Sequence, residues 1–239
     1  MKSNYDYDFC CFCREGRFQY NKIADLPGEE GVVYRDENIF VIPDIAPVVE
    51  SHFLAVSEEH KNSFGGATIE TNYSLEKAKK FFMNLENVNQ RRTLFLEHGS
   101  SREGRGICID HAHLHMLHVN DNICSEKIDR LILNYTNDKK VKADLDVLSM
   151  FAKNDMPYVY YEMDGKSWVY HTPILPRQFT RKLLSNFFPV ESFVWNELYK
   201  TEGSKNRFKE TLKLAKPKPT RNNCFECTLN NKTLPLALV

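Results

Sequence analysis

Residues 111–117 have the sequence His-Ala-His-Leu-His-Met-Leu, in which histidine alternates with apolar residues. Successive side chains of a β-strand point to opposite faces, so this stretch predicts a strand with His111, His113 and His115 about 7 Å apart on one face. His118 follows closely, so four of the eight histidines lie within eight residues. We therefore expect a strand with one side in the core and one side lined by imidazoles.

An imidazole-lined face suits nucleophilic attack on phosphorus. Imidazole, with an ordinary pKa of about 6.5, is largely neutral at cellular pH, and the phosphoramidate that it forms is labile enough to be hydrolysed. Neighbouring imidazoles can orient the attacking ring and donate to charged oxygens or to the leaving group. A three-histidine metal site and a solvent-facing strand rich in histidine are the alternative interpretations.

The sequence around this strand predicts an antiparallel sheet with a helix. Short apolar runs bounded by polar turns indicate strands, and apolar residues three or four apart from Leu75 to Val88 indicate an amphipathic helix ending near Arg91. The expected strands are residues 32–34, 39–42, 52–56, 93–96 and 107–119. Together these elements predict an α+β domain over residues 1–120.

The rest of the chain predicts a smaller α+β unit. Residues 121–156 are largely polar, with a helical patch at 145–151, and are expected to be a connection or insertion. The Asp164-Gly165 dipeptide is typical of a hairpin turn and lies between expected strands at 158–163 and 167–171. With helices expected at 178–188 and 206–216, this gives a carboxy-terminal unit over 157–216. Residues 217–239 have no periodicity and are expected to be a disordered tail.

Composition excludes some classes of function. The 32 basic side chains balance the 32 acidic ones, so no overall positive field attracts nucleic acid. We find neither a signal peptide pattern nor an apolar run of the roughly 20 residues that a membrane span needs. The sequence therefore predicts a cytoplasmic protein that does not contact membranes.

The histidine stretch and its upstream partners resemble the histidine-triad (HIT) superfamily. The segments 37–47 and 51–56, followed by His60, are similar in order to the amino-terminal half of that family, and the resemblance covers about residues 10–119. It implies a nucleotide hydrolase with a covalent nucleotidyl-histidine intermediate. By position, His113 would be the nucleophile, His115 would assist at phosphate oxygens or the leaving group, and His111 would orient the site or bind metal.

The same resemblance implies residues that bind the nucleotide. Asp44 matches an acidic residue that accepts hydrogen bonds from ribose hydroxyls, although an Asp between two prolines also favours a turn. Apolar walls for a base would come from Ile39, Phe40 and Ile42, for which ordinary core packing is the alternative. Phosphate contacts are expected from the loop residues Ser100, Ser101 and Arg105, for which a merely flexible loop is the alternative. Residues 106–110 depart from the family pattern, which often has an amide and a hydroxyl there. His98 leads into this loop and is expected to be structural.

A zinc site is the second implication of the resemblance. Cys10-Cys11-Phe12-Cys13 resembles the opening of zinc-containing HIT proteins, whose other ligands map to His60 and His111. The ligands Cys10, Cys13, His60 and His111 would form a closed, structural Zn²⁺ site; a reduced thiol pair is the alternative. Cys224 and Cys227 have the same spacing, but no histidine lies near them in the sequence, and their role stays open.

The carboxy-terminal unit resembles the extension of CwfJ-like proteins, which also carry a HIT-related domain. Four polar residues of this unit could reach phosphates or a nucleic-acid end: Arg177, Gln178, Arg181 and Lys182. A solvated basic helix face is the commoner meaning of such residues. Three functions are therefore carried forward: nucleotide hydrolase, nucleotidyltransferase or phosphorylase, and RNA-processing binding module. Transferases of the superfamily commonly have glutamine at the position of His115, which favours hydrolysis. A homodimer is a further possibility.

Overall fold

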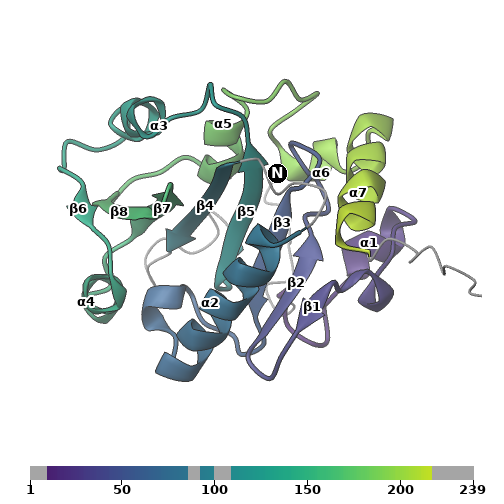
Figure 1. Ribbon diagram of the computed structural model, residues 1–239, viewed down its shortest axis with the longest axis horizontal. Helices are drawn as coiled ribbons and strands as arrows, with labels where there is room; N and C mark the ends of the chain where they lie inside the picture. Colours follow the sequence, from purple (N-terminus) through teal and green to yellow (C-terminus); the bar gives the residue numbers. More distant parts are fainter. Residues whose placement is uncertain (1–9, 86–91, 100–108, 217–239) are drawn as a thin grey trace, which may run out of the picture.

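The structure is a computed structural model that describes residues 10–85, 92–99 and 109–216 (Figure 1). In chain order the elements are α1 Gln19–Ile23, η1 Glu29–Gly31, β1 Tyr34–Arg35, β2 Ile39–Pro43, β3 Phe53–Ser57, η2 Phe64–Gly66, α2 Ile69–Met83, β4 Arg92–Gly99, β5 His113–Val119, α3 Ser125–Ile132, β6 Val141–Lys142, α4 Leu145–Lys153, β7 Tyr158–Met163, β8 Lys166–His171, α5 Phe179–Leu184, α6 Trp195–Leu198 and α7 Glu202–Ala215. The expected tail and Cys224 and Cys227 lie outside the described residues.

One antiparallel sheet organises the molecule. Its eight strands have the order β1-β2-β3-β5-β4-β7-β8-β6, and every strand pair is antiparallel. With helices added to this sheet, the α+β class expected from the sequence is confirmed. Among the described residues, no helix is long and apolar enough to cross a membrane.

Helix α2 covers one face of the sheet. Its Leu75, Ala78 and Phe82 pack on core-facing side chains of the strands, including Leu114 and Met116 of β5. The helix begins earlier than the periodicity predicted because the Thr68 side chain accepts a hydrogen bond from the Thr71 backbone N–H and caps it. It ends at Met83, and residues 86–91 of the expected helix lie outside the described part of the chain.

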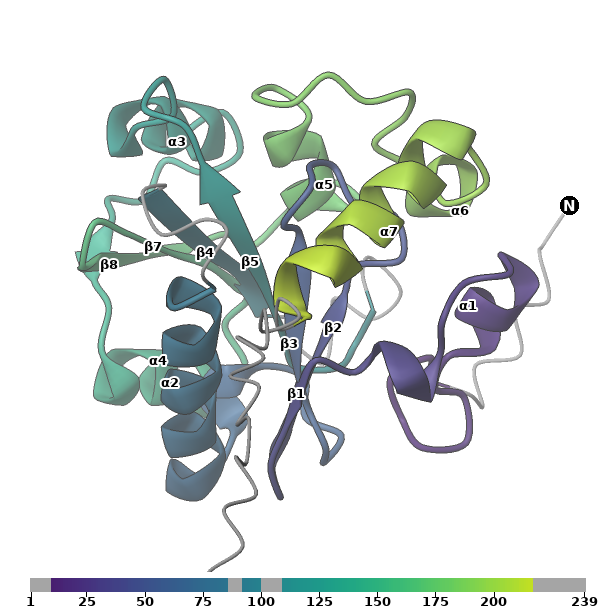
Figure 2. The ribbon, with the colours of Figure 1, turned by 45° about the vertical axis from the view of Figure 1, so that its right-hand side comes forward.

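The carboxy-terminal helices gather on the other side. Figure 2 shows α5, α6 and α7 on the side of β2 and β3 away from α2. Phe179 of α5 and Phe208 of α7 are buried in a core cluster that also contains Leu117 of β5. The face of β5 that carries histidines therefore lies on the side covered in part by these helices.

The expected carboxy-terminal unit has no sheet of its own. Strand β7 pairs with β4 over its whole length, from Leu94 opposite Met163 to Gly99 opposite Tyr158. The β7–β8 hairpin turns at Asp164 and Gly165, whose φ angles of 53° and 69° are those that such a two-residue turn requires. Pairing with β7 satisfies the hydrogen-bonding groups at the edge of β4, so strands of both expected units belong to one continuous sheet. Residues 121–156 contribute the edge strand β6 to this sheet and also form the helices α3 and α4.

Candidate active site

Strand β5 presents two of the predicted catalytic histidines on the face away from α2. In the sheet register, His113 lies opposite Val56 and His115 lies opposite Leu54 of β3. The intervening Leu114 is 1% exposed in the α2 core. The alternation expected from the sequence is thus present, although the strand begins at His113 and not at residue 107. His118 lies on the α2 face, where its ring packs 4.0 Å from that of Phe82.

A backbone carbonyl fixes the proton on His113. Its Nδ1 lies 2.6 Å from the carbonyl oxygen of His111, and because a carbonyl only accepts, Nδ1 must carry the hydrogen. The Nε2 atom of the neutral ring is then left with a free lone pair. Burial lowers the pKa of His113 below its ordinary value of 6.5, although the bond to His111 acts in the opposite direction. The ring is therefore a neutral base or nucleophile at pH 7.

A backbone N–H fixes the proton on His115 through His52. The amide of Val48 donates to Nδ1 of His52 at 3.3 Å, so the hydrogen of a neutral His52 is on Nε2. That Nε2 lies 2.9 Å from Nδ1 of His115, which must accept. Nε2 of His115 consequently carries a hydrogen that it can donate. Burial lowers the pKa of His52 to about 4 and that of His115 well below 6.5, so both rings are neutral at pH 7.

His98 of β4 is an additional imidazole beside His113. Leu96 lies opposite His115 in the register, and His98 is two residues along the same strand. Burial lowers its pKa to about 4, and the charge of His113 acts in the same direction. The sequence predicted a structural role for His98.

Asp44, the predicted ribose ligand, lies in a buried ion pair. Its carboxylate is fully buried and accepts from both the Arg181 guanidinium, 2.6 Å from Oδ2, and the Ala46 amide. Burial alone would raise the pKa of Asp44, but Arg181 first and then His52 lower it below its ordinary value. The Arg181 side chain is only 10% exposed, so its interpretation as part of a solvated face is wrong. A ribose could reach Asp44 only if this pair opened.

The three apolar residues predicted to wall a base divide between two faces of β2. Ile39 faces α2, because alternate residues of a strand point to opposite sides; it therefore cannot line the histidine side. Phe40 is on the histidine side but is fully buried, with the Arg17 guanidinium 3.9 Å above its ring. Of the three, Ile42 lines a pocket. The predicted phosphate ligands Ser100, Ser101 and Arg105 lie outside the described residues.

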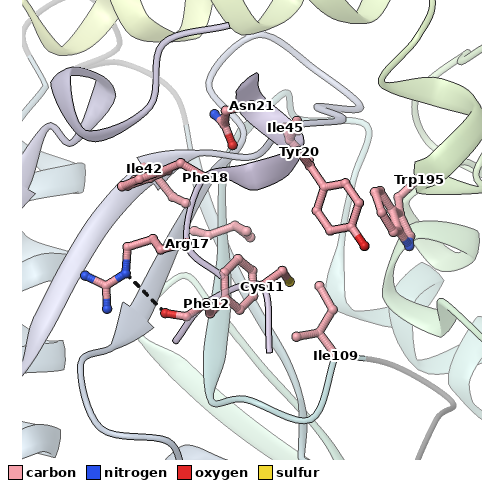
Figure 3. Close-up of a pocket in the computed structure, with 11 residues that line it drawn as sticks. Cys11, Phe12, Arg17, Phe18, Tyr20, Asn21, Ile42, Ile45, Ile109 and Trp195 are labelled. Atoms are coloured by element: carbon pink, nitrogen blue, oxygen red, sulfur yellow. Dashed lines mark hydrogen bonds between the residues drawn. The ribbon is translucent and has the colours of Figure 1, made fainter. Parts of the chain in front are cut away.

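Figure 3 shows the pocket that Ile42 lines. Phe12 lines it too, and its ring centroid is 5.4 Å from that of His113. Tyr20 and Trp195 complete the wall, the latter from the carboxy-terminal α6. Sequence reasoning gave no role to Phe12, Tyr20 or Trp195, because they come from segments that only the tertiary fold brings together.

Four predicted metal ligands converge at the start of β5. The ligand atoms of Cys10, Cys13, His60 and His111 all lie within 4.8 Å of one another. Nδ1 of His111 lies 3.4 Å from Sγ of Cys10 and 3.7 Å from Sγ of Cys13, and Nδ1 of His60 lies 3.2 Å from Sγ of Cys13. These distances are close to the roughly 3.6 Å that tetrahedral zinc geometry gives between sulfur and nitrogen ligands. Nε2 of His111 donates to the Ser57 carbonyl at 2.7 Å, which leaves the Nδ1 lone pair facing the thiols. The four residues thus fit a tetrahedral metal ion.

A second convergent group contains Asp44, His52 and His115. Both carboxylate oxygens of Asp44 already accept hydrogen bonds from the Arg181 guanidinium. Nε2 of His52 and Nδ1 of His115 are hydrogen-bonded to each other. A cation there would have to displace a buried guanidinium. We therefore assign this group to orienting His115.

No protein-family model and no curated protein matches the chain. Solved structures that match include histidine-triad proteins. A histidine triad nucleotide-binding protein from Sulfolobus tokodaii is 24% identical, covering 48% of this chain and 76% of that chain, with a TM-score of 0.33. A HIT family hydrolase from Clostridium thermocellum is 21% identical over 49% and 96% of the two chains, with a TM-score of 0.36. A yeast Ap4A phosphorylase in complex with Ap4A is 15% identical over 82% and 80%, with a TM-score of 0.40.

Proposed function

We propose that this chain is a nucleotide hydrolase that works through a covalent nucleotidyl intermediate on His113. The observation that carries the proposal is the pair of fixed tautomers on β5. The His111 carbonyl leaves a lone pair on Nε2 of His113, whereas His52 leaves an N–H on Nε2 of His115. One acceptor and one donor on neighbouring rings suit a nucleophile and a stabiliser of phosphate oxygens.

The reaction would proceed in two displacements at the α-phosphorus. Nε2 of His113 bonds to phosphorus while the bond from phosphorus to the leaving atom breaks, and the leaving group departs with the electron pair. A phosphate leaves as the oxyanion, and the nitrogen of a phosphoramidate takes up a proton from water as it leaves. The His111 carbonyl stabilises the resulting cationic imidazole through the Nδ1 hydrogen, and the N–H of His115 donates to a phosphate oxygen. Water then attacks phosphorus, the P–N bond breaks, and a nucleoside monophosphate and one proton are released.

The substrate class is a nucleoside phosphate derivative: a dinucleoside polyphosphate, a phosphoramidate or an adenylated nucleic-acid end. These substrates share an α-phosphorus with a displaceable group. A nucleotidyltransferase or phosphorylase would use an acceptor phosphate in place of water, and we favour hydrolysis because the third triad position is His115 and not glutamine. Asp44, Ser100, Ser101 and Arg105 remain predicted contacts to the nucleotide.

Mass spectrometry of the denatured protein tests the chemistry. After brief exposure to diadenosine tetraphosphate, adenosine phosphoramidate or a 5′-adenylated oligonucleotide, we expect a nucleotidyl adduct on a peptide that contains His113. His113→Ala should lose both adduct and turnover. The control is His171→Ala, which changes a histidine of β8 that is paired with Asp138 and should retain both. Turnover by His113→Ala would refute the proposal, and binding without turnover would favour an RNA-processing binding module.

We further propose that Cys10, Cys13, His60 and His111 hold a structural zinc ion. Four protein ligands leave no position for water, so the ion would tie residues 10–13 to the strand of His113 and would not enter the chemical step. Burial and the adjacent Cys10 raise the pKa of the Cys13 thiol to about 11, so binding as a thiolate would release a proton.

Elemental analysis of the purified protein tests this site. We expect about one zinc per chain, loss of the zinc in Cys13→Ser, and a lower melting temperature for that variant. Cys124→Ser is the matched control, since Cys124 is a free cysteine outside the group. Full folding stability of Cys13→Ser together with metal-free wild-type protein would contradict the zinc assignment.

A further inference from the structure

The pocket beside the histidines is built for a flat apolar ligand. Its empty space, counted together with the open solvent at its mouth, is about 490 Å³. Side chains of Phe12, Ile42, Leu54 and Ile109 line it, and aromatic rings of Tyr20 and Trp195 stand at one side (Figure 3). Arg17 and Asn21 are the polar side chains of an otherwise mainly apolar lining, which suits an aromatic ring.

The position of the pocket ties it to the reacting atoms. Phe12 lines the pocket and contacts the rings of both His111 and His113, at centroid distances of 5.8 and 5.4 Å. Leu54, on another wall, lies opposite His115 in the sheet. A nucleotide whose α-phosphorus meets His113 would therefore lie beside this pocket, because the Phe12 ring belongs to the pocket wall and contacts His113.

Trp195 is held firmly at the pocket although it is only partly buried. Its ring stacks on Tyr199, with centroids 5.7 Å apart, and meets Tyr20 edge-on at 4.7 Å. Its backbone N–H donates to Oε1 of Gln178 at 2.7 Å. Gln178 immediately precedes α5, which the buried pair between Arg181 and Asp44 anchors to the sheet. A preorganised indole loses little conformational freedom when it binds.

We propose that Trp195 is a base-stacking residue: the nucleobase enters the pocket and stacks on the indole in place of the Tyr20 ring. This inference rests on the proposed function, which supplies the nucleotide. Stacking does not distinguish strongly between bases, because every base has a π-face. Trp195 would therefore bind any nucleobase and would not select among adenine, guanine and the pyrimidines. The carboxy-terminal segment would thereby complete the substrate site of the amino-terminal half.

Intrinsic fluorescence tests the stacking directly, since the chain has two tryptophans. Trp168→Phe leaves Trp195 as the only indole, and Trp195→Phe leaves Trp168, which lies on β8 against Lys140. We expect AMP to quench the emission of Trp168→Phe saturably and to leave Trp195→Phe unchanged. Ribose 5-phosphate, which lacks the base, should quench neither. Unchanged emission of Trp168→Phe at AMP concentrations that saturate it in equilibrium dialysis would overturn the inference.

Kinetics supply a second reading. Trp195→Leu should raise KM roughly tenfold, the order expected for one lost base stack, with kcat nearly unchanged, and Trp168→Phe should leave both constants as in the wild type. The adduct on His113 separates the two proposals. Quenching without an adduct supports base stacking on Trp195 and refutes the nucleotidyl-histidine chemistry. An adduct without quenching supports that chemistry and refutes base stacking on Trp195. If neither is found, both proposals are refuted.

Discussion

At the residue scale, backbone groups decide which nitrogen of His113 and of His52 carries a proton. The Val48 amide holds His52 in the tautomer that donates to His115. His52→Ala should free His115 to take either tautomer and lower kcat roughly 10- to 100-fold, the range for losing a partner that orients a metal-bound histidine. His52→Gln keeps an N–H donor and should fall between Ala and the wild type. Steady-state kinetics check this order, with His171→Ala as control; equal kcat for Ala and Gln would contradict it.

The burial of His52 also makes folding stability depend on pH. Its pKa is lowered from 6.5 to about 4, chiefly by burial, so between these values the unfolded chain binds a proton that the folded chain does not. Acidification through that window should therefore lower the free energy of unfolding, by up to about 1.4 kcal/mol per pH unit from this residue. Urea titrations at several pH values should show a shallower slope for His52→Gln and an unchanged slope for His171→Gln. Equal slopes for His52→Gln and the wild type would contradict the assignment.

At the element scale, one buried ion pair docks α5 on the segment after β2. Asp44 is fully buried and Arg181 nearly so, and removing one member of such a pair leaves an uncompensated charge. Arg181→Met should reduce the free energy of unfolding by about 3–5 kcal/mol, whereas Lys213→Met, which breaks an exposed pair, should change it by less than about 1 kcal/mol. Asp44→Asn in the Arg181→Met background should be milder than the sum of the single changes. Chemical denaturation measures the free energy of unfolding of these variants and of the single Asp44→Asn variant. If the losses of the two single changes add up in the double variant, a direct coupling of Asp44 and Arg181 is excluded.

The elements that the sequence predicted well are those with local signals. The apolar run of β2 and the Asp164-Gly165 turn of the β7–β8 hairpin were predicted to within a residue or two. Helix α3, over Ser125–Ile132, was missed because its segment is largely polar and only Ile128 and Ile132 are buried. The pairing of β7 with β4 was missed too, since the two strands are far apart in sequence and no local pattern names a strand's partner.

The site divides in the same way. Spacing alone places His113 and His115 on one face, and the predicted zinc ligands follow from the resemblance. By contrast, Arg181 lies 137 residues from Asp44, and the meeting of Tyr20 with Trp195 also depends on distant segments. A basic residue on a helix is usually solvated, so its burial against Asp44 is decided by tertiary packing, which the sequence pattern does not contain.

At the scale of the whole molecule, a continuous sheet predicts a single cooperative unit. Strand β4 lies between β5 and β7, and Leu94, Leu96 and Tyr161 are buried in the same cluster as Phe179. A chain cut after residue 156 would expose this apolar surface and the edge of β4. We therefore expect the truncated chain to aggregate or to lack a cooperative unfolding transition.

The full chain should unfold in one step. Both tryptophans lie in the carboxy-terminal half, at Trp168 and Trp195, so their emission follows that half, while far-UV circular dichroism follows every helix and strand. For a single cooperative unit the two urea transitions coincide, because no intermediate with one half folded is populated. Different urea midpoints for the fluorescence and the circular dichroism transitions would contradict this prediction, as would a fragment of residues 1–156 that remains soluble and unfolds cooperatively. Either result would show that β4 is stable as an edge strand without β7. The division into residues 1–120 and 157–216 would then describe two folding units and not merely two stretches of sequence.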